Sequence, residues 1–176
     1  DPILAVTLAP ADAFELWQIP LFILLGVLCG LMAWYFTSMN SRVGGFFKSI
    51  DKQYKKWLWG GAILGILIFV FPPLYGEGYE GFTSLMHGNA QELFNSLFYR
   101  FRDIDWVIIL FVIATMFFKV IAMSTTNAAG GVGGTFAPSL FVGAFTGASL
   151  ALVCNTLFGW EVSIVSFTLV GMAGVM

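Results

Sequence analysis

The sequence predicts an all-α, polytopic membrane protein, and three observations support this fold class. Of the 176 residues, 59% are hydrophobic and 10% are charged, whereas soluble domains carry about 25% charged residues. The mean hydropathy of the chain is +0.87. The apolar residues form several runs without charge, each close to the roughly 20 residues that cross the hydrocarbon core of a bilayer. The formal net charge of −2 gives no indication of a binding partner.

The first apolar run, residues 16–36, holds no charged residue and predicts a transmembrane helix. The next stretch, residues 40–56, is a basic loop and amphipathic segment with five of the eight Lys and Arg residues of the chain. The positive-inside rule places this loop in the cytoplasm. A nucleic-acid-binding patch is the alternative. Because the loop lies between two apolar runs, we expect a lipid bilayer beside it and no nucleic-acid partner.

The second apolar run, residues 57–75, opens with two interfacial tryptophans and ends at a Pro-Pro pair. Residues 76–89 follow and contain Glu77 and Glu80 but no Lys or Arg. This contrast in charge predicts an external loop, in which we expect both carboxylates to be solvated rather than to carry protons. Residues 90–101 then predict a short interfacial helix.

The third apolar run, residues 104–123, has Asp105 at its start and one charge in its interior, Lys119. A charge inside a membrane span is costly and indicates function. Lys119 is therefore a candidate electrostatic helper that raises the positive potential along an anion path. Alternatively, its side chain reaches an interface or pairs with a nearby polar group. Residues 124–127 are polar, and they either line a wet vestibule or satisfy backbone groups.

The fourth apolar run, residues 135–160, has no charge, and a fifth run fills residues 162–176. Small residues recur four apart in the fourth run and predict one smooth face for close helix packing. These pairs are Gly143 with Gly147 and Ala144 with Ala148. The cysteines lie in apolar runs without metal-like neighbours, so we expect buried free thiols and no metal site.

Both ends of the chain are abrupt, because it begins without Met and its last apolar run has no polar flank. We therefore expect residues 1–176 to be part of one transmembrane domain, truncated at both ends.

A glycine-rich break, residues 130–138, separates the third and fourth apolar runs and is the most informative motif. We expect Thr135 to be the N-cap of a helix that starts within the membrane and Phe136 its first residue. The first amides of such a helix have no intrahelical acceptor, and its dipole is positive there. The backbone amides of Thr135 and Phe136 are therefore candidate ligands for a small anion.

Four neighbouring residues support this motif. Gly133 and Gly134 allow an ion to approach the backbone closely. Ala137 follows Phe136 in the first turn. Pro138 lacks a backbone N–H, but this costs no hydrogen bond, because an N–H in the first turn of a helix has no intrahelical acceptor. The alternative is a turn that only packs, as in a membrane scaffold or an intramembrane enzyme. No catalytic pair is visible in the sequence, so we expect no enzyme and no catalytic residue.

The break resembles the CLC family of chloride channels and proton-coupled chloride exchangers. Gly134-Thr135-Phe136-Ala137-Pro138 is similar to the GxFxP signature of that family, and residues 139–147 continue its PSLxxGAxxG pattern. Residues 72–79 are similar to the proline-then-GxGY loop of bacterial members. The resemblance covers nearly the whole chain and implies a CLC-type helical bundle, roughly helices J to O in the second half of the family's membrane domain.

The resemblance also implies a function. In the family the amides of the second and third GxFxP residues face the central chloride, which points to Thr135 and Phe136. The GSGIP and GREGP motifs, the final tyrosine and the proton glutamate are absent from this sequence. The resemblance therefore implies one wall of a chloride pathway, in a voltage-gated-type channel or alternatively an antiporter. It also implies a homodimer in a bacterial inner membrane, with chloride as the transported ligand and no cofactor.

Overall fold

The computed structural model describes residues 16–75 and 105–176, and these residues form α-helices and short 3-10 turns without any strand. A 3-10 turn, Leu16–Gln18, leads into α1, Ile19–Lys48. Helix α2, Gln53–Val70, is followed by a second 3-10 turn, η3, at Pro72–Leu74. The remaining helices are α4, Asp105–Ala129, α5, Phe136–Phe158, and α6, Ile164–Val175. The predicted external loop and interfacial helix, residues 76–101, lie outside the described residues.

Three of the described helices are long and apolar enough to cross a membrane, namely α1 with its leading 3-10 turn, α4 and α5. Helix α2 is not among them, although it covers most of the second apolar run. The all-α, membrane-protein fold class predicted from the sequence is thus confirmed.

Helix α1 runs through residue 48 and α2 begins at residue 53, so the prediction of a loop over residues 40–56 was wrong except for residues 49–52. Residues 40–48 contain no proline, and their polar side chains lie on exposed positions of the helix. Nothing therefore stops the helix at the end of its apolar part. The last helical residue is Lys48, and the amide of the C-cap residue, Ser49, donates to the carbonyl oxygens of Phe46 and Phe47.

Helix α4 also extends further than its apolar run, because it includes the polar residues 124–127. Thr126 Oγ1 donates to the Ala122 carbonyl at 2.9 Å, and Asn127 Nδ2 donates to Met123 Sδ at 3.2 Å. These local bonds satisfy polar side chains inside a helix. Ser124 and Thr125 are buried instead. Helix α4 therefore ends at Ala129, and the break begins at Gly130 as predicted.

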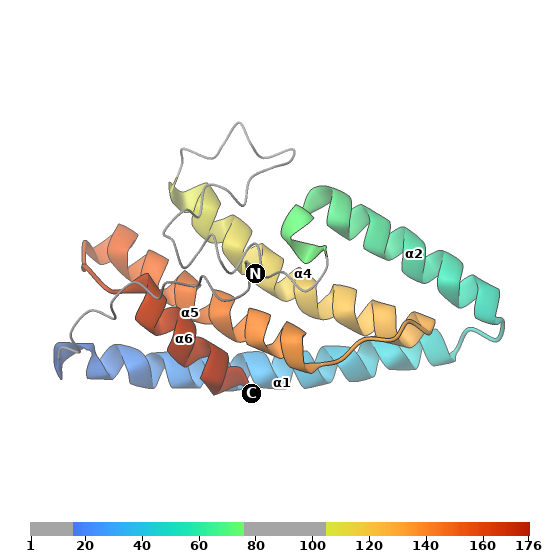
Figure 1. The fold of residues 1–176 in the computed structure, drawn as a ribbon, viewed down its shortest axis with the longest axis horizontal. Helices are drawn as coiled ribbons and strands as arrows, with labels where there is room; N and C mark the ends of the chain where they lie inside the picture. Colours follow the sequence, from blue (N-terminus) through green and yellow to red (C-terminus); the bar gives the residue numbers. More distant parts are fainter. Residues whose placement is uncertain (1–15, 76–104) are drawn as a thin grey trace, which may run out of the picture.

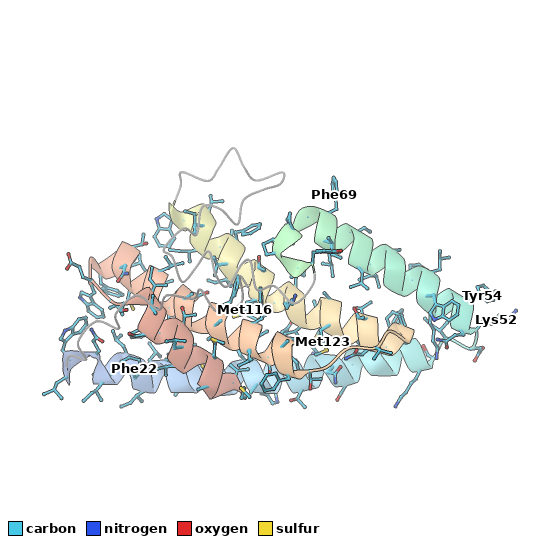
Figure 2. The ribbon with its side chains drawn as sticks, viewed as in Figure 1. Phe22, Lys52, Tyr54, Phe69, Met116 and Met123 are labelled. Carbon is cyan, nitrogen blue, oxygen red and sulfur yellow. The ribbon has the colours of Figure 1, made fainter. Side chains whose placement is uncertain are left out.

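The helices pack as a flat bundle in which neighbours along the chain run in opposite directions (Figure 1). Helix α1 lies along one edge and contacts α4, α5 and α6, whereas α2 contacts mainly α4. Figure 1 shows α2 at the other edge of the bundle from α1. The core lies between α1, α4, α5 and α6, where Leu25, Val112, Phe145 and Phe167 are almost fully buried. Met116 and Met123 of α4 point into the bundle (Figure 2).

Helices α5 and α6 approach closely enough to exclude side chains from their interface. A Cβ at Gly143 would collide with the Gly171 carbonyl oxygen and lie 2.8 Å from Met172 Cα. A Cβ at Gly147 would collide with the Phe167 carbonyl oxygen. Ala144 and Ala148 are fully buried beside them. The smooth face predicted from the four-residue spacing is therefore confirmed, and Cys29 and Cys154 are buried free thiols as predicted.

Candidate anion site at the start of helix α5

The break begins where α4 is tied to α2. Gln53 Nε2 donates to the Ala129 carbonyl oxygen at 3.3 Å. The Gly130 and Gly131 amides donate to Asn127 O at 3.2 Å and Thr126 O at 2.9 Å. These bonds supply donors to carbonyl groups that the end of an α-helix leaves without an intrahelical partner. The start of the break is thus fixed by both helices.

Two of the glycines in the break are required by the shape of this chain. Gly130 has φ +101°, in the region that side chains rarely adopt. A Cβ at Gly131 would lie 2.9 Å from the backbone carbonyl oxygen of Thr126. A Cβ at Gly133 would meet only the end of the Asn127 side chain, at 2.9 Å from Oδ1. Gly134 differs, because a Cβ there would meet no atom within 4 Å. Its small size is therefore not explained by packing within the described residues.

Helix α5 begins at Phe136, and Thr135 is its N-cap by position, as predicted. The hydroxyl of a threonine N-cap usually accepts a hydrogen bond from the first turn, but the Thr135 side chain makes no capping bond. Its backbone has φ −91° and ψ −14°, a helical conformation, whereas a side-chain cap needs an extended one. The Thr135 carbonyl accepts instead from the Ser139 amide at 3.0 Å.

The amides of Thr135 and Phe136 donate no hydrogen bond to any acceptor in the described part of the chain. Thr135 and Phe136 are also exposed, with 62% of the Phe136 surface accessible. The dipole of a helix of 23 residues ends at these groups. The geometry thus leaves two N–H donors and a positive helix end open to a ligand.

A cavity of about 640 Å³ lies against this helix start. Its wall comes from α2 and η3, from α4, from the break and from the first turn of α5. The lining residues are Leu64, Ile68, Leu74, Tyr75, Lys119, Ala122, Met123, Thr126, Asn127, Val132, Gly133, Gly134, Phe136, Ala137 and Pro138. The structure therefore gathers six of the seven predicted site residues in one cavity, and Thr135 alone of that set is outside its wall.

Lys119 supplies a cationic group to this wall. Its side chain is only 4% exposed, and Nζ donates to the Leu74 carbonyl oxygen at 3.2 Å. Nζ also lies 4.9 Å from the centre of the Phe141 ring, within the range of a cation–π contact. The pairing with a polar group that the sequence offered as one interpretation is thus present. Lys119 also lines the cavity, and its role in attracting an anion stays a prediction.

The contribution of α2 and η3 to the cavity was not predicted. Leu64, Ile68 and Leu74 reach the break only because α2 folds back along α4. Gly60 allows that approach, since a Cβ there would lie 2.5 Å from Ala129 Cβ. Gly60 is one of three glycines in this apolar run, with Gly61 and Gly65, and the sequence does not show which of them makes such a contact. Of the polar residues 124–127, Thr126 and Asn127 line the cavity.

No group of three or more His, Cys, Asp or Glu side chains that could hold a metal ion occurs in the described residues. The chemistry available at the cavity is that of backbone amides, the Lys119 ammonium group, the neutral polar side chains of Tyr75, Thr126 and Asn127, and apolar walls. Such a set attracts an anion without a fixed ligand cage.

Comparison with known proteins identifies the family of the chain. The family described as "Voltage gated chloride channel" matches residues 2–176. The chain is 28% identical over 174 residues to chloride channel protein CLC-e and 29% identical over 187 residues to chloride channel protein CLC-f, both of Arabidopsis thaliana. The alignments cover 90% and 98% of this chain but 23% and 22% of the plant proteins.

A bacterial relative is similar at the same level. The putative chloride channel protein ClcB-like of Ralstonia nicotianae is 26% identical over 162 residues, which cover 91% of this chain and 34% of that protein. The chain therefore spans about a quarter to a third of the length of these relatives. No solved structure matches the chain.

The three long apolar helices are those of a polytopic integral membrane protein, and the start of α5 lies beside the middle of α4. The chain belongs to the voltage-gated chloride channel family, as the match over nearly its whole length shows. The resemblance drawn from GxFxP is thereby confirmed. Family membership also places the chain among channels and transporters and not among enzymes.

Proposed function

We propose that the protein carries chloride across a membrane, and that the start of α5 forms one wall of the chloride pathway. The main support is the pair of backbone amides at Thr135 and Phe136, which have no hydrogen-bond acceptor in the described residues. Neutral amides and a helix dipole attract an anion yet allow it to leave, as permeation requires.

The depth of this helix start supports the proposal. Phe136 shares a cavity wall with Lys119 and Ala122, which lie within the body of α4 and not at its end. Helix α4 is one of the helices able to span a membrane. Figure 1 likewise shows the start of α5 away from both ends of α1. A helix end inside the span faces a low dielectric, in which its attraction for an anion is stronger than at a wet surface.

We propose a passive chloride channel, in keeping with the plant and bacterial relatives, which are named chloride channel proteins. The test is chloride efflux from liposomes that contain the full-length protein, measured with and without a pH gradient. We expect chloride efflux without accompanying proton movement. Absence of chloride flux would contradict the main proposal. Proton uptake driven by a chloride gradient would instead identify the proton-coupled exchanger.

The variant Gly134→Val tests the site itself. Because Gly134 has open space around its Cβ position, the fold should tolerate valine while the added methyl groups crowd the cavity. A hydrogen bond to an ion contributes about 1.5–3 kcal/mol, so displacing the anion should lower chloride flux by roughly tenfold or more. Gly26→Val is the matched control, since Gly26 in α1 also has open space and does not line the cavity.

Equal flux through the two variants would mean that the break is only a turn. The same comparison can be made with Glu77→Gln, in the loop outside the described residues. We expect Gly134→Val to reduce flux more than Glu77→Gln does.

A further inference from the structure

A cluster of basic side chains surrounds the point where α1 ends and α2 begins. We call this cluster the basic corner, and it consists of Arg42, Lys48, Lys52, Lys55 and Lys56. Four of these side chains are exposed, and Lys56 is half-buried. Asp51 is the one acidic residue between positions 40 and 56. No carboxylate of the described residues forms an ion pair with the cluster, so its positive charge is not compensated within them.

The length of α1 brings the basic corner to the surface of a bilayer. Its 30 residues correspond to about 45 Å, whereas the hydrocarbon core is about 30 Å thick. The part of α1 before residue 37 is apolar and accounts for most of that thickness. The last turns of α1, with Arg42 and Lys48, therefore extend into the headgroup region, and α2 starts there.

Exposed aromatic side chains accompany the charges. Tyr54, Trp57 and Trp59 of α2 are 57%, 61% and 56% exposed, and Phe46 of α1 is 57% exposed. Lys52 Nζ lies 5.9 Å from the centre of the Tyr54 ring. Figure 2 shows Lys52 and Tyr54 together at the tip of the bundle, away from its core. Tryptophan and tyrosine are enriched at the boundary between hydrocarbon and headgroups, so these rings indicate the same depth.

From this combination we propose that the basic corner binds the phosphate groups of anionic phospholipids. Several lysines on long stems can reach headgroup phosphates while their apolar stems remain along the aromatic rings. A free phosphate ion would match the charge, but it would make no favourable contact with the exposed aromatic rings beside the lysines. Lipid binding at the basic corner requires only that the protein lies in a membrane, and it does not depend on chloride transport.

The experiment places the full-length protein in nanodiscs of equal parts phosphatidylcholine and phosphatidylglycerol, and native mass spectrometry then counts the lipids that stay bound. We expect the wild type to retain phosphatidylglycerol preferentially. Each basic residue near an anionic surface strengthens attachment by roughly fivefold. The triple variant Lys48→Gln/Lys52→Gln/Lys55→Gln should therefore lose at least about tenfold of this preference.

Two matched variants make the result specific. Lys48→Arg/Lys52→Arg/Lys55→Arg keeps the charge and should keep the preference, and Lys52→Gln alone should show an intermediate loss. Equal retention of the two lipids by the wild type would overturn the proposal. Unchanged retention by the triple Gln variant would overturn it as well. Displacement of the bound lipid by millimolar inorganic phosphate would assign the corner to free phosphate instead.

Discussion

At the scale of single residues, the start of α5 and the cavity beside it combine two kinds of positive potential. The amides of Thr135 and Phe136 act at short range and along one direction, because they are the end of a helix dipole. The ammonium group of Lys119 acts over a longer distance, and burial limits its screening by water. Its bond to the Leu74 carbonyl oxygen also holds η3 against α4. Lys119 can thus act through its charge, through its contacts, or through both.

Replacement of Lys119 by methionine tests whether its ammonium group matters for transport. Methionine keeps an apolar chain of similar length but loses the charge, the hydrogen bond to the Leu74 carbonyl oxygen and the cation–π contact with Phe141. At an effective dielectric of about 20, a charge about 10 Å from an anion contributes roughly 1.7 kcal/mol, which is more than tenfold in affinity. We expect chloride flux of Lys119→Met in liposomes to fall by roughly tenfold, and Lys119→Arg to retain most of it. If the methionine variant conducts like the wild type, Lys119 is only a structural contact.

At the scale of the elements, the seam between α5 and α6 fixes the direction of α5. Gly143 and Gly147 face the backbone of α6 at Gly171 and Phe167, with no room for a Cβ on either helix. Thr146 and Ser149 of α5 are buried near this seam and donate to the carbonyl groups of Val142 and Phe145. Interhelical contact without side chains maximises van der Waals packing in a bilayer. A shift of α5 along this seam would move the amides at its start.

The variant Gly147→Ala tests the seam through stability. The added methyl group collides with the Phe167 carbonyl oxygen, and neither backbone can yield cheaply. Overpacking of this kind costs about 1–3 kcal/mol, so the full-length variant should unfold at a lower temperature in detergent. Gly30→Ala is the control, because Gly30 of α1 has open space and alanine favours a helix by about 0.5–1 kcal/mol. A melting temperature of Gly147→Ala at or above that of the control would contradict the seam.

The elements also show what the sequence could and could not predict. Apolar runs predicted the helices, the Pro-Pro pair predicted the end of α2, and Thr135 predicted the first residue of α5. The end of α1 was missed because apolar periodicity stops where the membrane does, whereas a helix stops only where capping or a breaker stops it. The α2 wall of the cavity was missed because it depends on a contact between Gly60 and Ala129, far apart in the chain.

At the scale of the whole molecule, we propose that the described residues form one part of a longer chloride pathway. The chain spans about a quarter to a third of the length of its relatives, and the start of α5 is exposed within the described residues. We propose that the remainder of the full-length protein supplies the opposite wall and the gate. A homodimer in an inner membrane, with residues 40–56 on the cytoplasmic side and residues 76–89 outside, stays a prediction of the sequence.

The most direct test of the central claim is to locate an anion in the full-length protein. Bromide has a strong anomalous X-ray signal and can replace chloride, so crystals grown in bromide reveal where the anion binds. We predict an anomalous peak within hydrogen-bonding distance of the Thr135 and Phe136 amides, and its loss in Gly134→Val. Bromide peaks elsewhere in the pathway, with none at the start of α5, would contradict the account.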